Sequence, residues 1–342
     1  MTRRRAVLIA GLFVVTAALG CARAPSEQVV VYTSVDQVFA EPVLLAFEQL
    51  SGINVRAVYD TEETKSTGVL NRLLAESQHP RADVFWSGDP IRPQILITRG
   101  LVAPYEPASA EGIPAAFRAM DGTWTGFSAR ARVILVNTEL VPEGERPDSI
   151  RDYLEPRWKD RTAIANPAYG TTTTHIAALF EAWGDEEGRA FLTGLRENGV
   201  RVAASNGEVK RLVAAGEVAW GVVDTDDAAV AVESGAPVAV IFPDDGDLGT
   251  LVIPTVAVRI AESPNPGPAE ALMDYLVSAE VERALAEAAC RQMPLRAGVP
   301  TPRGVRSVAE IDAMEVDYPT LGDAVERLHP GFLAWAEGTG GP

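Results

Sequence analysis

Cysteine is almost absent from this chain of 342 residues, which contains only Cys21 and Cys290. A disulfide framework of the kind that holds small secreted domains together is therefore excluded. The fold has to rely on buried apolar surface, and 47% of the residues are hydrophobic. A chain of this length exceeds the size at which one core usually stops growing, so we expect two lobes.

Histidine is nearly as scarce, and His79, His175 and His329 do not have the spacing of metal ligands. The sequence also lacks a Gly-x-Ser-x-Gly elbow, a His-Glu-x-x-His pair and a phosphate-binding Gly-Lys-Ser/Thr motif. These absences argue against an enzyme, and we expect no catalytic residue. An enzyme that works with paired carboxylates stays open as an alternative, because such a pair cannot be recognised from sequence.

Basic residues are few relative to acidic ones: 30 Lys and Arg against 47 Asp and Glu give a net charge of −17. Nucleic acid is therefore excluded as an expected partner. An acidic surface attracts cations rather than anions, although simple solvation of the protein explains the charge equally well.

The N-terminal residues have the pattern of a targeting segment. Three arginines at positions 3–5 precede an apolar run over 6–18, which is shorter than the roughly 20 residues of a spanning helix. We therefore predict a signal peptide over residues 1–20 and export of the protein to the periplasm or cell surface. The sequence Ala18-Leu19-Gly20-Cys21 resembles the lipobox of bacterial lipoproteins, which implies a lipidated Cys21, a tether over 21–27 and a membrane-anchored protein. An ordinary signal peptide is the alternative.

Apolar periodicity predicts alternating strands and helices, beginning with a strand at Val29–Tyr32, a helix over Phe39–Leu50 and a strand over Ile53–Tyr59. A second set of elements starts at the strand Thr162–Ala165 and includes a helix over Thr173–Trp183. This βαβ order predicts an α/β fold with two lobes, mostly parallel central sheets and connecting strands that act as hinges.

Five segments carry a family resemblance, and they occur in this order: Val31-Tyr32-Thr33-Ser34, residues 80–87, residues 127–133, residues 216–220 and Gln292-Met293-Pro294-Leu295. Together they resemble the ferric-ion-binding proteins of ABC importers, which have the type II periplasmic binding fold. The resemblance implies a monomeric binding protein that clamps its ligand between two lobes and delivers it to an ABC permease and its ATPase. The implied organisation is lobe 1 over 28–124, a hinge crossing over 125–136, lobe 2 over 137–250, a second crossing over 251–260 and C-terminal helices over 261–342 that return to lobe 1 and pack on the lobes.

The resemblance places the metal site at Asp224-Thr225-Asp226-Asp227, where relatives carry adjacent tyrosines, and places Asp36 where relatives carry a histidine. No tyrosine pair occurs in the chain. A single phenolate ligand could still come from Tyr32, Tyr59 or Tyr169, and Tyr32 is the candidate ligand among them. Carboxylates are hard oxygen ligands, and they suit Fe(III), another hard cation or an ammonium group. One aspartate could simply cap the next helix. Three carboxylates within four residues repel one another unless a cation or donors lie among them, which favours a site.

An anion-binding loop is predicted between the strand that ends at Ala165 and the following helix. Tyr169, Gly170 and Thr171 offer hydroxyl groups and free N–H groups at a helix start. The resemblance implies a synergistic phosphate or carbonate here, assisted by Arg130 and Asn206. Helix capping is the alternative for the threonines.

Other polar residues are expected to line the same cleft: Thr33, Ser34, Thr61, Glu62, Ser87 and Thr225. The combined site suits a metal with a bridging anion, or a zwitterion such as an aminoalkyl phosphonate or a phosphate ester. A sensor-adaptor lipoprotein that presents its ligand to a receptor is a further alternative to an importer component.

Overall fold

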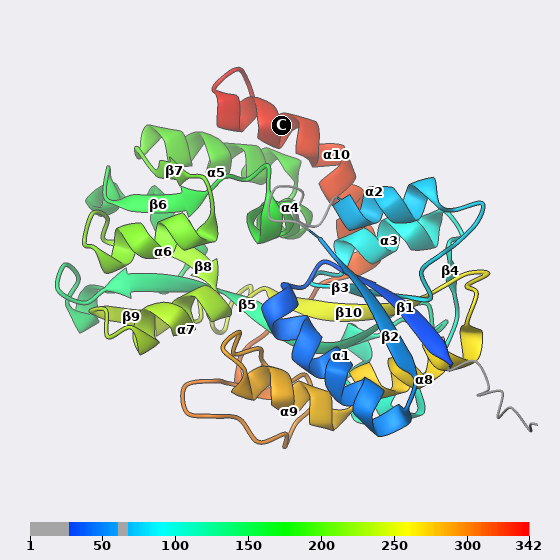
Figure 1. Cartoon of the computed structure of the whole chain (residues 1–342). Coiled ribbons are helices and arrows are strands. Elements are labelled where there is room, and N and C mark those ends of the chain that lie inside the picture. The colour runs from blue at the N-terminus through cyan, green and yellow to red at the C-terminus, as the bar shows by residue number, and fades with distance from the viewer. Residues whose placement is uncertain (1–26, 61–67, 342) are drawn as a thin grey trace, which may run out of the picture.

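The computed structural model describes residues 27–60 and 68–341. Figure 1 shows two α/β lobes side by side, joined by long strands and braced by a C-terminal helix. The strands follow the order β2-β1-β3-β10-β5-β8-β6-β7, with β4 on β10 and β9 on β5. No helix among the described residues is both long enough and apolar enough to cross a membrane. The predicted signal peptide, Cys21, Thr61 and Glu62 lie outside the described residues.

Lobe 1 is built on β1, which pairs in parallel with β2 and β3. Its strands are β1 (Gln28–Thr33), β2 (Asn54–Tyr59), β3 (Val84–Ser87), β4 (Val102–Ala103), β10 (Val252–Ile260) and the first half of β5 (Thr125–Asn137). Its helices are α1 (Gln37–Ser51), α2 (Gly68–Ala75), α3 (Ile91–Thr98), α8 (Pro266–Leu276) and α9 (Ala279–Glu287). α2 and α3 lie on one side of the sheet, and α1 and α8 lie on the other (Figure 1). The predicted βαβ start of the chain is therefore confirmed.

Lobe 2 repeats this plan with β6 at the centre of a parallel set, between β7 and β8. Its strands are β6 (Thr162–Ala165), β7 (Arg201–Ala203), β8 (Trp220–Asp224), β9 (Val238–Ile241) and the second half of β5. Its helices are α4 (Gly170–Trp183), α5 (Asp185–Glu197), α6 (Asn206–Ala214) and α7 (Thr225–Glu233). α4 begins at Gly170, three residues before the predicted start at Thr173, so Gly170 and Thr171 of the predicted anion-binding loop belong to the helix.

The strand β5 belongs to both lobes. Its residues Thr125–Ala131 pair with β10, whereas Arg132–Asn137 pair with β8 and β9. Every pairing of β5 and β10 is antiparallel, so the sheets are parallel only within the βαβ segments. The expected hinge role of 125–136 and 251–260 stays a prediction, but β5 changes partners between residues 131 and 132, at the boundary of the lobes.

The last helix, α10 (Tyr318–Glu337), packs against α3 of lobe 1 and α4 of lobe 2. The Trp335 indole donates to the carbonyl of Leu192 at 2.9 Å, and the Tyr318 hydroxyl donates to the carbonyl of Val252 at 2.9 Å. α10 therefore braces the two lobes (Figure 1). Trp86 and Trp220 are fully buried and pack in the two cores, as expected for strand residues.

Candidate functional site

Two arginines flank the point at which β5 passes from one lobe to the other. Arg130 and Arg132 are two residues apart, so their side chains leave the same face of the strand. The Arg132 side chain is fully buried, and that of Arg130 is 21% exposed. A charged group in such surroundings requires counter-charges and hydrogen bonds, and lobe 2 supplies most of them.

Asp224 is the direct partner of Arg132. The two residues stand opposite each other in the register of β8 and β5, and an Arg132 guanidinium nitrogen lies 2.6 Å from Oδ1 of Asp224. A nitrogen of Arg130 lies 3.6 Å from Oδ2 of the same carboxylate. Burial opposes ionisation of Asp224, but Arg132 and Arg130 outweigh it and hold the pKa of Asp224 below its usual value.

Hydroxyl and amide groups complete the surroundings of Asp224. The Thr171 hydroxyl donates to Oδ2 at 2.8 Å, and the Asn206 amide lies 3.3 Å from the same oxygen. Arg132 also donates to the hydroxyls of Thr171 at 3.0 Å and Thr172 at 3.2 Å. Thus the side chains of Arg130, Thr171 and Asn206, which sequence reasoning assigned to an external anion, surround a carboxylate of the protein itself.

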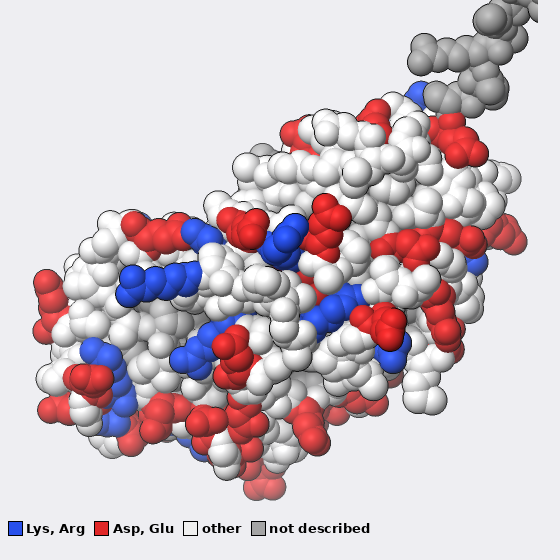
Figure 2. Space-filling model, turned by 90° about the horizontal axis from the view of Figure 1, so that it is seen from below, with Lys and Arg blue, Asp and Glu red and all other residues white. Residues whose placement is uncertain are grey.

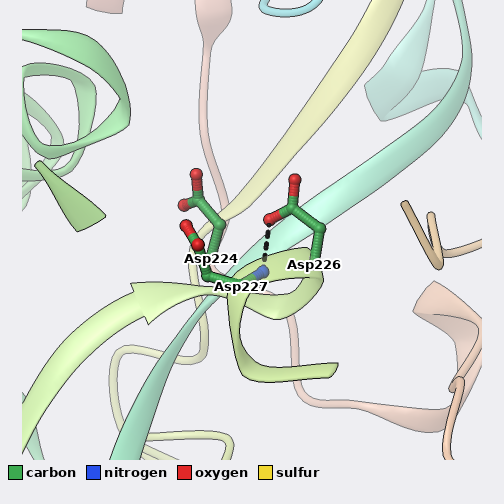
Figure 3. A group of neighbouring side chains, drawn as sticks. All are labelled: Asp224, Asp226 and Asp227. Atoms are coloured by element: carbon green, nitrogen blue, oxygen red, sulfur yellow. Dashed lines mark hydrogen bonds between the residues drawn. The ribbon is translucent and has the colours of Figure 1, made fainter. Parts of the chain in front are cut away.

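Asp226 and Asp227, in the first turn of α7, form the accessible part of the site. One carboxylate oxygen from each of Asp224, Asp226 and Asp227 can be chosen so that all three lie within 4.8 Å of one another. Figure 3 shows the three side chains gathered at the junction of β8 and α7, with the Asp227 amide donating to Asp226 at 3.0 Å. The side chains of Asp226 and Asp227 are 26% and 23% exposed.

Basic groups lie beside these two aspartates. The Lys210 ammonium lies 2.9 Å from Asp227, and Arg130 lies 3.8 Å from Asp226. Burial, opposed by Arg130 and reinforced by Asp224 and Asp227, raises the pKa of Asp226 to about 6. The same carboxylates raise the pKa of Arg130 against the effect of burial. The site thus alternates acidic and basic groups, and Figure 2 shows a similar mixture of charges over one face of the molecule.

Arg130 also contacts lobe 1. Its guanidinium donates to the carbonyl of Gly88, just after β3, at 2.8 Å. The Gly88 amide in turn donates to the Ser34 hydroxyl at 3.0 Å, at the end of β1. Arg130 therefore links the carboxyl ends of two lobe 1 strands to the aspartates of lobe 2.

The other residues predicted as ligands are Tyr32, Asp36 and Tyr169. The Tyr32 hydroxyl donates to Glu76 at 2.9 Å, and burial together with Glu76 raises its pKa to about 12. Tyr32 is thus committed to a carboxylate that is not part of the aspartate group. Asp36 is the N-cap residue of α1 and is partly buried. Tyr169 is the N-cap residue of α4, and its side chain projects outward with the residue 61% exposed.

The described residues expected to line the cleft make internal hydrogen bonds. Ser34 accepts from Gly88, and Thr225 accepts from the Ala131 amide at 3.2 Å. Thr33 accepts from the Val35 amide at 3.0 Å, and Ser87 accepts from Asp89 at 3.4 Å. Ser34 and Thr225 therefore hold strand ends at the lobe boundary, and Thr33 and Ser87 stabilise the turns beside them.

Sequence reasoning missed Arg132 and Lys210. A signal for Arg132 was present, since a single arginine in the apolar run Ala131–Val136 must have a buried partner. The partner itself could not be found, because Asp224 is opposite Arg132 only through the register of two distant strands. Lys210 lies one helical turn after Asn206 on α6, so both side chains reach the aspartates from the same face.

Comparison with known proteins identifies the family to which the chain belongs. Residues 80–311 match the family described as bacterial extracellular solute-binding protein. The chain belongs to this family. Its members are substrate-binding transport proteins rather than enzymes, in agreement with the absence of catalytic motifs.

Several curated proteins align with most of the chain. Iron uptake protein A1 of Synechocystis is 28% identical over 292 residues, covering 82% of this chain and 79% of that protein. The major ferric iron-binding protein of Neisseria meningitidis is 27% identical and covers 94% of both chains. A putative 2-aminoethylphosphonate-binding periplasmic protein of Salmonella typhimurium is 26% identical, covering 85% of this chain and 84% of that protein.

Solved structures agree on the fold. Iron-bound HitA from Pseudomonas aeruginosa superposes with a TM-score of 0.79 at 23% identity, covering 92% of this chain and 99% of that chain. A Trichodesmium protein in complex with iron and citrate ligands superposes with a TM-score of 0.78 at 22% identity, covering 92% of this chain and all of that one. The type II periplasmic binding fold predicted from the sequence is therefore confirmed.

Proposed function

We propose that this protein is the solute-binding component of an ABC importer and that its cargo is ferric iron or a hard cation of similar chemistry. The observation that carries the proposal is the convergence of the partly exposed Asp226 and Asp227 carboxylates beside Asp224 at the lobe boundary. Carboxylate oxygens are hard ligands, which suit cations of high charge density. The names of the Synechocystis and Neisseria relatives support the same cargo.

Within this proposal Asp226 and Asp227 are the cation ligands. Both side chains are about a quarter exposed, whereas Asp224 is committed to Arg132, Thr171 and Asn206. A bound cation takes the place that the Lys210 ammonium and the Arg130 guanidinium now hold against these carboxylates. Asp36, at the start of α1 in lobe 1, is the candidate ligand from the opposite lobe.

A zwitterionic organic solute is the second candidate. The site presents basic groups directly beside its acidic ones, with Lys210 and Arg130 within 4 Å of Asp227 and Asp226. An aminoalkyl phosphonate could place its ammonium group on the aspartates and its phosphonate on the basic side chains. The name of the Salmonella relative supports this alternative.

The proposed setting is a monomeric lipoprotein, exported by its signal peptide, anchored through Cys21 and paired with a permease and an ATPase. Mass spectrometry of the membrane fraction tests the anchor: the parent should carry diacylglycerol on Cys21, and a Cys21→Ser variant should appear unmodified and soluble. Genes for a permease and an ATPase beside this one would favour the importer over a sensor-adaptor.

Ligand titrations of metal-stripped protein test the cargo. Melting temperature is followed with Fe(III) supplied as its nitrilotriacetate complex, with Ca²⁺ and with 2-aminoethylphosphonate, because a ligand well above its Kd stabilises the folded state. The Asp226→Asn, Asp227→Asn double variant should lose more than roughly a hundredfold in affinity for the responding cation. The Asp323→Asn, Glu326→Gln variant makes the same charge change at exposed positions of α10 and should bind as the parent does.

The outcomes separate the candidates. Stabilisation by Fe(III) that the double variant loses supports the cation proposal. A response to 2-aminoethylphosphonate alone would replace it with the zwitterion. Unchanged Fe(III) affinity in the double variant would refute the assignment of Asp226 and Asp227. The bound Fe(III) should give no red charge-transfer band, since such a band requires a tyrosine ligand.

A further inference from the structure

We propose that the Asp224 carboxylate is a built-in anion: it fills the anion-binding part of the site, so that the protein binds its cargo cation without an external phosphate or carbonate. The statement about the cargo rests on the function proposed above. The statement that Asp224 fills an anion-binding position stands on the contacts of the protein alone.

Both oxygens of Asp224 are occupied by donors from three different elements. Arg132 on β5 binds Oδ1 at 2.6 Å, while Thr171 on α4 and Asn206 on α6 approach Oδ2 at 2.8 and 3.3 Å. Arg130 lies 3.6 Å from Oδ2. Two guanidinium groups, a hydroxyl and an amide around one small anion form a complete anion-binding site, and the carboxylate within it is 4% exposed.

An external anion cannot share this position. It would need the donors that Asp224 already uses, and it would face the carboxylates of Asp226 and Asp227 a few ångströms away. Like charges at such distances destabilise each other. The charge requirement of Arg132 is met by a group that is part of the chain and always present.

Asp224 is also fixed in place. It ends β8, where it is paired with Arg132 in the strand register, and it is the N-cap residue of α7. Rotating its side chain away would leave the fully buried Arg132 guanidinium without a carboxylate, which is strongly unfavourable. Asp224 therefore serves Arg132 and not the cargo, and the cargo is left to Asp226 and Asp227.

The decisive experiment is chemical rescue of a metal-free variant. Asp224→Ala removes a carboxylate of about the size of formate and leaves the donors of Arg132, Thr171 and Asn206 open. Its melting temperature should lie well below that of the parent, and sodium formate should raise it by several degrees in a saturable manner, compared with sodium chloride of the same ionic strength. The parent should respond equally to both salts.

A matched control is Asp83→Ala. Asp83 is also fully buried, but its hydrogen bonds come from the amide groups of Val30 and Asn265 and not from an arginine. Formate should not rescue this variant beyond the chloride effect. A folded Asp224→Ala protein without specific formate rescue, or equal rescue of both variants, would overturn the proposal.

The parent provides a second test that does not depend on the variant folding. Metal-free parent protein is titrated with inorganic phosphate and with bicarbonate. A saturable stabilisation that Asn206→Ala abolishes would place an external anion at these donors and would overturn the proposal. We expect phosphate and bicarbonate to change the melting temperature no more than sodium chloride of the same ionic strength does.

The statement about the cargo can be tested only if a cation binds to the protein. The affinity of the parent for that cation should be unchanged by added bicarbonate, whereas that of Asp224→Ala should rise with added formate. If no cation binds at all, the proposed function fails while the formate result still decides whether Asp224 is the built-in anion.

Discussion

Replacement of Arg132 by methionine should be among the most destabilising single changes in lobe 2. The substitution keeps an unbranched side chain of similar length. It removes the closest counter-ion of Asp224, since Arg132 lies 2.6 Å from that carboxylate, and the Asp224 side chain is only 4% exposed. Loss of one partner of a buried pair typically costs about 3–5 kcal/mol. Because Arg130 remains 3.6 Å from Oδ2 and Thr171 and Asn206 still donate, we expect a value near the lower end, about 3 kcal/mol.

A double-mutant cycle isolates the interaction. Asp224→Leu alone leaves Arg132 buried without a carboxylate and should be similarly destabilising. The Arg132→Met, Asp224→Leu double variant should lose less than the sum of the two by about 2 kcal/mol or more, since neither buried charge then remains unpaired. Equilibrium urea unfolding, followed by fluorescence of tryptophans that include the buried Trp220 on β8, measures all four proteins.

Arg201→Met is the control for this cycle. Arg201 forms an ion pair with Glu217 at 3.1 Å, but both side chains are nearly half exposed, so its loss should cost less than about 1 kcal/mol. Coincident transitions by fluorescence and circular dichroism would establish that the two lobes unfold together, which the free energies require. An Arg132→Met cost no larger than that of the control, or strict additivity in the cycle, would refute the role of the pair.

Two further predictions concern the core of lobe 2. Burial, and to a smaller extent Arg132, lowers the pKa of His175 from 6.5 to about 3. As the pH falls, the unfolded chain therefore binds a proton at this residue before the folded protein does. The free energy of unfolding should decrease as the pH drops below 6.5, and the loss should be about 2 kcal/mol at pH 5. Urea unfolding at pH 5 and 7.5 should show a smaller acid loss in His175→Asn, and an identical loss would contradict the assignment. Gly221→Ala should destabilise by roughly 1–3 kcal/mol, because a Cβ there would lie 2.5 Å from the Ala163 carbonyl oxygen. Gly144→Ala, where a Cβ meets nothing within 4 Å, should melt like the parent, and equal melting of the two variants would refute the steric argument.

The strand–helix order was predictable wherever one residue pattern dominated. The apolar repeat of α1 and the β-rich runs of β1 and β2 are local signals, and the structure matches them to within a few residues. The helix α3 was not predicted, and α10 was predicted only as part of the C-terminal helices over 261–342, without bounds of its own. α3 and α10 pack against each other, and α10 also packs against α4 of lobe 2. Tertiary packing of this kind is not visible in a local residue pattern.

The start of α4 was misplaced for a related physical reason. Four consecutive threonines have modest helix propensity, and their hydroxyls favour loops and caps when they bond to the backbone. Here Thr171 and Thr172 are buried and accept hydrogen bonds from Arg132. The hydroxyls are thus used by a residue about 40 positions away in sequence, and this tertiary contact decides the local structure.

Tertiary contacts also determine the charge balance of the site. Sequence reasoning held that three carboxylates within four residues repel one another unless a cation or donors lie among them, and that premise is correct. In the structure the protein's own basic side chains lie among the carboxylates: Arg132 neutralises Asp224, Arg130 lies beside Asp226, and Lys210 neutralises Asp227. The aspartate cluster is therefore stable in the metal-free protein. What distinguishes its members is how firmly each is committed, since Arg132 is fully buried whereas Lys210 and Arg130 are 24% and 21% exposed. A cargo cation competes with the two accessible bases at far lower cost than with the buried one. For that reason Asp226 and Asp227, rather than Asp224, are the positions at which substitution should change ligand affinity more than folding.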